Sequence, residues 1–218
     1  MVCSCRSPIA ATARHFDDRR VRQELAAYRT AGPRATTQGL LRELLAVGPP
    51  PATLLDIGSG IGALSFGLLR AGVQSAVCVD ISQSALNASL EEARHQGVAD
   101  RVELHAGDFV ELAPTLRSAE LVTLDRVVCC YPAYGPLLAE AASHSRRLLA
   151  LSYPRDRWWV RVALWLENAW RRVRGDSFQA FVHSPAAMVA LLERHGFTRR
   201  RAAGTWTWQI EIYARNVT

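Results

Sequence analysis

The chain has 218 residues, of which 49% are hydrophobic, and this length suits one α/β domain with a full core. All 26 basic residues are arginine and 20 residues are acidic, so the net charge is +6. Because the arginines are spread along the chain, they argue against a dedicated nucleic-acid-binding protein. No apolar stretch reaches about 18 uncharged residues, so we expect no membrane-spanning helix and a cytoplasmic location.

Five cysteines, an odd number, argue against a disulfide framework. Cys3 and Cys5 lie near the N-terminus, and Cys78 lies in an apolar run that predicts a buried strand. Cys129 and Cys130 stand together after a further apolar run. The chain has no C-x-x-C motif and its histidines are scattered, so we expect no metal site.

Residues 1–48 are predicted to form an N-terminal arm and helical lid. Two helices are expected there, over 17–30 and 36–46, interrupted at Gly32 and Pro33. The run Pro49–Pro51 cannot continue a helix, so it separates the arm from the domain formed by residues 49–218.

Strands and helices then alternate along the chain. Strands are predicted over 52–57, 75–80, 101–106, 120–125 and 147–152, and helices over about 62–71, 83–96 and 134–144. This alternation is typical of right-handed βαβ units, so we predict an α/β fold with a mostly parallel sheet and helices on both faces.

The last third contains all six tryptophans. A strongly amphipathic helix is predicted over 158–173, within a tryptophan-rich cap at about 155–184. We expect its apolar face to be buried against the sheet; the alternatives are a lid over a flat aromatic substrate and a helix lying on a membrane surface. A further helix over about 185–195 precedes a hairpin of two strands, over 197–203 and 206–214.

A glycine-rich turn directly follows the first predicted strand. The stretch Leu54–Gly62 contains Gly58, Ser59, Gly60 and Gly62, and glycines let the backbone approach a ligand closely. The second strand ends at Asp80, 22 residues after Gly58, where a carboxylate can accept hydrogen bonds from both ribose hydroxyls. The pattern therefore predicts a pocket for a ribose-bearing cofactor.

Two carboxylates help to choose the cofactor. Asp56 precedes the glycines and can meet an ammonium group, while Asp108 with Phe109 ends the third strand, where they suit an exocyclic amine and a purine ring. The spacing also matches the G-x-G-x-x-A pattern of nicotinamide dinucleotide enzymes. However, no separate substrate domain is left for hydride transfer.

Together these motifs resemble the class I S-adenosylmethionine-dependent methyltransferases over about residues 50–214. The resemblance implies a Rossmann-like seven-stranded sheet with an antiparallel last strand and S-adenosylmethionine as cofactor, with S-adenosylhomocysteine as product. It implies that Gly58 and Gly60 line the methionine moiety, that Asp80 holds the ribose, and that Asp108 and Phe109 meet adenine. The other residues expected around the cofactor are Asp56, Ser59, Gly62, Ile81 and Asp125.

A closer similarity is to the magnesium-protoporphyrin O-methyltransferases. It rests on the Tyr131-Pro132 pair after the fourth strand, the segment Leu149–Pro154, and Tyr28 in the arm. That family has a histidine where this chain has Cys130, and a thiol does not replace an imidazole base, so the difference argues against a porphyrin substrate. We therefore predict methyl transfer, with transfer to oxygen favoured, onto a small aromatic or carboxylate-bearing molecule.

Four side chains are candidates for the chemistry of methyl transfer: Tyr28, Cys130, Tyr131 and His183. Each also has a structural interpretation, since Tyr28 can anchor the arm, Cys130 and Tyr131 can pack beneath a helix, and His183 lies beside a helix cap. Asp125, at the end of the fourth strand, is expected to contact cofactor or substrate rather than pair with Arg126.

Three other functions are consistent with parts of the sequence. The arginines suit an RNA methyltransferase, the absence of an evident base suits a non-catalytic cofactor-binding module, and the G-x-G-x-x-A spacing suits an NAD-dependent oxidoreductase. We expect a small-molecule substrate, no nucleic acid, and a monomer or homodimer.

Overall fold

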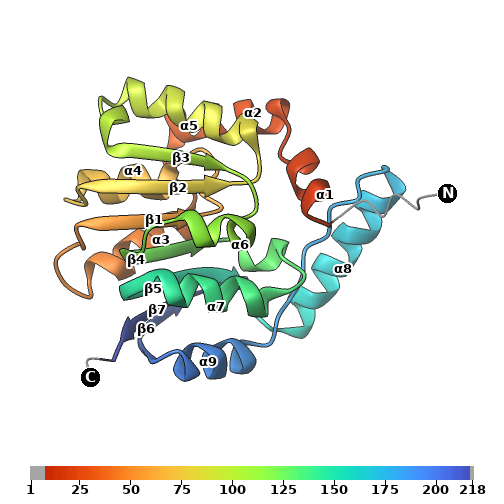
Figure 1. Cartoon of the computed structure of the whole chain (residues 1–218). Helices are drawn as coiled ribbons and strands as arrows, with labels where there is room; N and C mark the ends of the chain where they lie inside the picture. Colours follow the sequence, from red (N-terminus) through yellow and green to blue (C-terminus); the bar gives the residue numbers. More distant parts are fainter. Residues whose placement is uncertain (1–7, 217–218) are drawn as a thin grey trace.

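The computed structural model describes residues 8–216, and its centre is a seven-stranded sheet in the order β3-β2-β1-β4-β5-β7-β6 (Figure 1). Six strands run in the same direction, and β7 runs antiparallel to them. The strands are β1 (Thr53–Ile57), β2 (Ser75–Asp80), β3 (Val102–Ala106), β4 (Ala119–Asp125), β5 (Ser145–Pro154), β6 (Phe197–Gly204) and β7 (Trp208–Arg215). This confirms the predicted Rossmann-like sheet with an antiparallel last strand.

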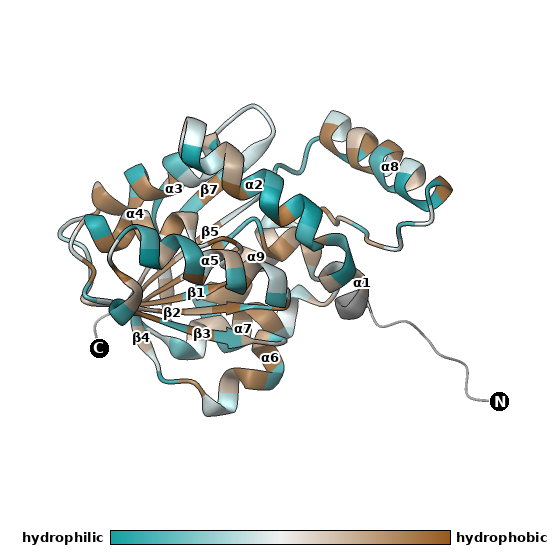
Figure 2. Ribbon diagram, turned by 90° about the horizontal axis from the view of Figure 1, so that it is seen from above, coloured by the Kyte–Doolittle hydropathy of each residue, from teal (hydrophilic) through white to brown (hydrophobic). Residues whose placement is uncertain are grey.

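Helices cover both faces of the sheet (Figure 2). One face carries α3 (Ala35–Leu45), α4 (Ala63–Arg70) and α5 (Gln83–His95), and the other carries α6 (Phe109–Leu112), α7 (Tyr134–His144) and α9 (Pro185–Arg194). Successive residues of β1 contribute to the hydrophobic layers on opposite faces of the sheet. Leu54 packs toward the first group of helices and Leu55 toward the second.

Three further helices lie at the edge of the sheet where the parallel strands end: α1 (Pro8–His15), α2 (Asp18–Ala31) and α8 (Trp158–Val173) (Figure 1). The arm is held to the domain by Arg29 of α2, whose guanidinium donates to Glu91 and Glu92 of α5 at 2.9 and 2.8 Å. The Ser82 hydroxyl also donates to the carbonyl of Phe16 at 2.7 Å. These contacts place the arm over the edge at which the cofactor motifs lie.

Two features of the sequence interpretation change. Helix α1 was not expected, and it begins upstream of the helix predicted to start at residue 17. The prediction that α8 buries its apolar face is wrong, since Val160 is its only buried residue and its tryptophans include several that are highly exposed. The amphipathic pattern predicts the helix correctly, but it does not specify which face meets protein.

The structure also bears on the cysteines and on membrane insertion. Cys78 is buried in β2 as predicted, whereas Cys3 and Cys5 lie outside the described residues. Within residues 8–216, none of the helices has the length and apolar character needed to cross a membrane.

Candidate active site

A cavity of about 870 Å³ lies at the carboxyl edge of the parallel strands, beneath the arm and α8. Its floor is formed by the ends of β1, β2 and β4, and its walls by α1, α2, α8 and the segment after α8. Of the predicted site residues, those lining it are Tyr28, Asp56, Gly58, Ser59, Gly60, Asp80, Ile81, Asp108, Phe109, Asp125, Cys130 and Tyr131. The fold therefore brings most of the predicted site into one place.

The glycine-rich loop has two kinds of glycine. Gly60 has a φ of 55°, and a Cβ built on it meets no atom within 4 Å, so this backbone is open to a ligand. Gly62 has a φ of 82° and lies outside the cavity lining, where a Cβ would come within 2.6 Å of the Ser89 hydroxyl. Gly62 thus allows α4 to pack closely on α5, which is a structural role.

Asp80 is fixed at the end of β2 by the backbone. Its Oδ2 accepts from the Gly60 N–H and its Oδ1 from the Ser82 N–H, both at 2.8 Å. Burial is the largest influence on its pKa, which is raised, although the backbone donors act in the opposite direction. Each carboxylate oxygen keeps a further acceptor position, so this residue suits a pair of ligand hydroxyls.

Asp56 lies deeper, beneath the glycine-rich loop, and is 1% exposed. Its two oxygens accept from the hydroxyls of Ser65 and Thr123, each at 2.6 Å. Burial raises its pKa to about 7, while the two hydroxyls lower it. The hydrogen-bond partners of Asp56 in the structure are neutral hydroxyls. Its expected contact with a ligand ammonium group therefore stays a prediction.

Asp108 and Tyr131 contact each other in the cavity lining. The Tyr131 hydroxyl donates to both carboxylate oxygens of Asp108, at 3.0 and 2.8 Å, and burial followed by this carboxylate raises the pKa of Tyr131. Asp108 also caps α6 by accepting from the Val110 N–H at 3.0 Å. The Phe109 ring is buried and contacts the His144 ring edge-on, so its expected stacking on a purine stays a prediction.

Asp125 ends β4 as predicted, but its carboxylate is held by hydroxyls. It accepts from Thr37 of α3 and from Ser152 of β5, both at 2.5 Å. The next residue, Arg126, is the only non-glycine residue with positive φ (64°) among residues 8–216, a conformation that concentrates at functional sites. Its guanidinium lies 5.1 Å from the Trp208 ring centroid, and both residues line the cavity.

The four predicted catalytic residues have different surroundings. Tyr28 lines the cavity and its hydroxyl accepts from the Gln96 amide at 3.2 Å, so it combines a cavity position with an anchoring contact. The Sγ atom of Cys130 lies 3.8 Å from that of Cys129, and a thiol–thiol hydrogen bond lowers the pKa of Cys130. His183 lies outside the cavity lining and contacts the carbonyls of Val128 and Tyr131 at 3.1 and 3.0 Å, which favours a structural role.

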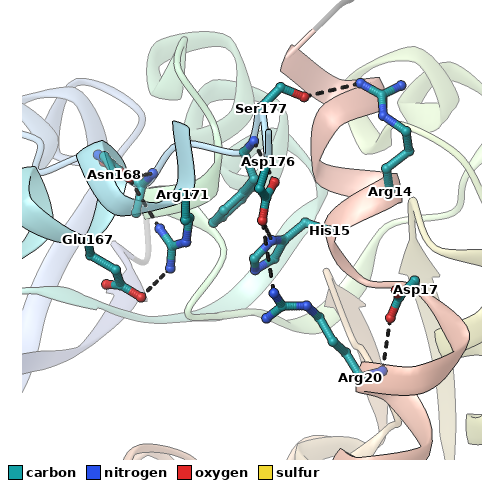
Figure 3. A network of polar contacts seen from close by, with 11 residues as sticks. Arg14, His15, Asp17, Arg20, Glu167, Asn168, Arg171, Asp176 and Ser177 are labelled. Atoms are coloured by element: carbon teal, nitrogen blue, oxygen red, sulfur yellow. Dashed lines mark hydrogen bonds and ion pairs between the residues drawn. The ribbon is translucent and has the colours of Figure 1, made fainter. Parts of the chain in front are cut away.

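Sequence reasoning missed a histidine–carboxylate pair, His15 and Asp176 (Figure 3), of which His15 lines the cavity. The Nδ1 atom of His15 lies 2.6 Å from Oδ2 of Asp176, and the imidazole stacks on Phe178 with centroids 4.2 Å apart. Burial, the largest influence, lowers the pKa of His15, whereas Asp176 raises it. The partners are separated by 161 residues, so no local spacing could have identified them.

The residues present fit S-adenosylmethionine. Asp80 offers acceptors for ribose hydroxyls, Gly60 leaves backbone open to the ligand, and Asp56 places a titratable carboxyl below the loop. Among the described residues there is no cluster of three histidine, cysteine, aspartate or glutamate side chains that could hold a metal ion.

Residues 54–149 match the family described as a methyltransferase domain. The fold is similar to that of magnesium protoporphyrin IX methyltransferase from Synechocystis PCC 6803 with bound S-adenosylhomocysteine, with a TM-score of 0.76 and 19% identity over 96% of this chain and 100% of that chain. It is also similar to the [4+2]-cyclase SpnF, with a TM-score of 0.72 and 11% identity over 97% of both chains. Proteins with different reactions thus share this fold.

Curated relatives match part of the chain. A release factor glutamine methyltransferase from Cereibacter sphaeroides is 37% identical over 86 residues, which are 39% of this chain and 30% of that protein. A ribosomal protein L11 methyltransferase from Pelotomaculum thermopropionicum is 31% identical over 120 residues, which are 55% of this chain and 38% of that protein. The chain therefore spans well under half the length of these relatives.

Proposed function

From its class I S-adenosylmethionine-dependent methyltransferase domain and fold, we propose that this chain transfers a methyl group to a small molecule bearing an aromatic ring or a carboxylate. Transfer to oxygen is favoured. The observation that carries this proposal is the cavity, which the cofactor motifs share with the arm and α8. Its volume of about 870 Å³ lies within the range of small-molecule pockets.

The cavity walls support an acceptor of this kind. Tyr28, Tyr131, Phe178 and Trp208 supply aromatic surface. Arg126 supplies a positive charge that forms no ion pair with any residue in the described part of the chain. We assign Arg126 as the partner of an acceptor carboxylate, because guanidinium and carboxylate groups match in geometry and charge.

His15 is the group best placed to take a proton from the acceptor. Asp176 holds its Nδ1, which leaves Nε2 for a ligand, and its lowered pKa keeps the imidazole neutral near pH 7. In this proposal Asp176 orients the imidazole, while His183 supports the turn formed by Val128 and Tyr131.

When bound, S-adenosylmethionine supplies a methyl group that is already activated by a positively charged sulfur. The residues of the chain therefore mainly have to orient the acceptor and exclude water, and such orientation can contribute roughly 7–11 kcal/mol. Asp80 and the Gly60 backbone hold the cofactor in this proposal, Arg126 orients the acceptor, and the arm with α8 covers both.

A protein acceptor is the alternative that the curated relatives favour, since the two described above are named as methyltransferases of a release factor and of a ribosomal protein. Helices α1 and α8 argue against it, because they cover the edge that a folded protein would have to approach. We keep a cytoplasmic location as part of the proposal.

Calorimetric titration with S-adenosylmethionine, S-adenosylhomocysteine and NAD tests the cofactor. We expect micromolar binding of the first two and none of NAD, whereas binding of NAD alone would overturn the proposal. Methyl transfer is then measured on three panels: aromatic and carboxylate-bearing small molecules, ribosomal and release-factor proteins, and RNA. Turnover confined to the protein or RNA panel would reject the small-molecule acceptor.

A further inference from the structure

Helix α8 presents an exposed apolar face. Trp158, Trp165 and Val173 are 73%, 68% and 81% exposed. Together with Trp206 in the β6–β7 turn, the exposed apolar residues form a surface that we call the tryptophan face: Trp158, Val162, Trp165, Leu166, Trp170, Val173 and Trp206. Among the described residues, Leu45 is the only other large hydrophobic residue classed as exposed, so this surface is unlike the rest of the molecule.

The opposite side of α8 is the side that faces the protein. Leu164, Glu167 and Arg171 line the cavity, and Val160 is buried. Figure 2 shows α8 set apart from the helices that cover the sheet. The helix thus turns its polar and mixed side inward and its apolar side to solvent, the reverse of an ordinary surface helix.

Aromatic contacts connect the helix to the sheet. The Trp159 ring lies 5.9 Å from that of Trp158 and also 5.9 Å from that of Trp206, measured between centroids. The tryptophan face is therefore one continuous surface supported by two elements, α8 and the β6–β7 turn.

Positive charge surrounds this surface. Residues 155–174 contain six arginines and two acidic residues. Arg157, Arg172 and Arg174 form no ion pair within residues 8–216, while the Arg174 guanidinium lies 4.6 Å from the Trp170 ring centroid. The Arg174 guanidinium adjoins the exposed Trp170 ring, and none of these three arginines has a carboxylate partner among the described residues, so the missing complement is anionic.

We propose that the tryptophan face docks on a lipid bilayer that contains anionic phospholipids. Tryptophan has an apolar ring with one polar N–H, which suits the boundary between acyl chains and headgroups, and arginine suits the phosphates at the same depth. A second copy of this chain fits less well. In a two-fold contact the same surface meets itself, so the unpaired arginines of the two copies would repel.

Flotation with vesicles tests this docking. Purified protein is mixed with phosphatidylcholine vesicles, with or without phosphatidylglycerol, and bound protein is followed by flotation and by tryptophan emission. We expect binding to the phosphatidylglycerol vesicles with a blue shift of emission, and weaker binding as salt is added. Failure to float with either kind of vesicle would overturn the proposal.

Matched variants separate the apolar and the charged contributions. V162S/W165S should lose binding, while the control Leu45→Ser, which removes exposed apolar surface elsewhere, should bind as before. R172A/R174A should weaken the partition of the protein into phosphatidylglycerol-containing vesicles about thirty-fold, and the control R22A/R94A should leave it unchanged. Equal losses in the controls would reject a localised docking surface.

Two further measurements identify other outcomes. Light scattering without vesicles would show a dimer that V162S/W165S dissociates if the surface instead binds a second copy, and that result overturns lipid docking. Titration of each variant with S-adenosylhomocysteine checks that it is folded. Because neither vesicle binding nor light scattering requires methyl transfer, failure here is distinguishable from failure of the proposed reaction.

Discussion

Asp80 provides the most direct test of the proposed cofactor. Asp80→Ala removes the acceptor of the Gly60 and Ser82 N–H groups and the proposed contacts with the ribose hydroxyls. Hydrogen bonds to charged groups contribute roughly 1.5–3 kcal/mol each, so we expect S-adenosylhomocysteine to bind at least about 100-fold more weakly. Calorimetry measures the loss, with the exposed Asp100→Ala as control. Unchanged affinity in Asp80→Ala would refute the assignment.

Arg126 allows the acceptor class to be tested separately from the cofactor. Arg126→Gln keeps a polar side chain over Trp208 but removes the charge. For a carboxylate-bearing acceptor identified in the turnover screen, we expect KM to rise roughly 10- to 100-fold, because a charged hydrogen bond is lost. The affinity for S-adenosylhomocysteine should not change. The exposed Arg117→Gln is the control, and an equal effect on uncharged acceptors would contradict the assigned role.

Asp56 makes stability depend on pH. Its folded-state pKa of about 7 lies above its usual value of 3.8, mainly because of burial. The folded protein therefore holds more protons than the unfolded chain between these values, and the stabilising contribution is lost as pH rises through 7. The loss from this group reaches at most roughly 4 kcal/mol. Urea unfolding at pH 5 and pH 8 measures this loss. We expect the free energy of unfolding to decrease less between these pH values in Asp56→Asn than in the unsubstituted protein, and equal decreases would contradict this.

At the scale of elements, the His15–Asp176 contact joins α1 to the segment after α8 (Figure 3). Burial lowers the folded-state pKa of His15 below 6.5. The contribution of His15 to the packing of α1 on the domain is therefore present above pH 6.5 and is lost as the pH falls through the folded-state pKa. We expect hydrogen exchange of α1 amides, corrected for intrinsic rates, to increase relative to that of α7 between pH 7.5 and pH 5.5.

Two histidine variants test whether His15 causes this pH dependence of α1 exchange. His15→Phe keeps an aromatic ring against Phe178 but cannot titrate, so the pH dependence of α1 exchange should disappear. His105→Phe, which changes a histidine of β3 far along the chain, should keep it. Persistence of the pH dependence in His15→Phe would assign it to another group.

The elements differ in how far the sequence could predict them. Strands such as β2 and β4 were predicted to within one residue, because apolar runs between glycine, proline and polar residues specify buried strands locally. Helix α8 was also located correctly, but its orientation was not, since an amphipathic pattern is the same whether its apolar side meets protein, lipid or solvent. Orientation depends on tertiary contacts, which a local pattern does not contain.

The same distinction applies to the site. Gly58, Gly60 and Asp80 were predictable because one βαβ unit sets their spacing, and the cavity contains all three. His15 and Asp176 were not, because they meet only after the arm folds over the sheet edge and the chain returns past α8. The carboxylate–hydroxyl contacts of Asp125 with Thr37 and Ser152 were missed for the same reason.

At the scale of the whole molecule, the cavity joins parts of the chain that are distant in sequence. Its lining extends from Thr12 in α1 to Trp208 in β7, so a ligand bound there contacts the arm, the sheet edge and α8 together. Such a ligand binds only the folded chain, and it therefore stabilises all of these elements against unfolding at once.

Thermal unfolding measures this coupling. At a concentration 100 times its Kd, a ligand adds about 2.7 kcal/mol to the free energy of unfolding. For a chain of this size each kcal/mol raises Tm by roughly 2–4 °C, so we expect S-adenosylhomocysteine to raise Tm by about 5–10 °C. NAD should leave Tm unchanged, and Asp80→Ala should not respond to S-adenosylhomocysteine, because its ribose contacts are absent. A shift with NAD alone would assign the glycine-rich loop to a dinucleotide, and with it the whole cavity to a different reaction.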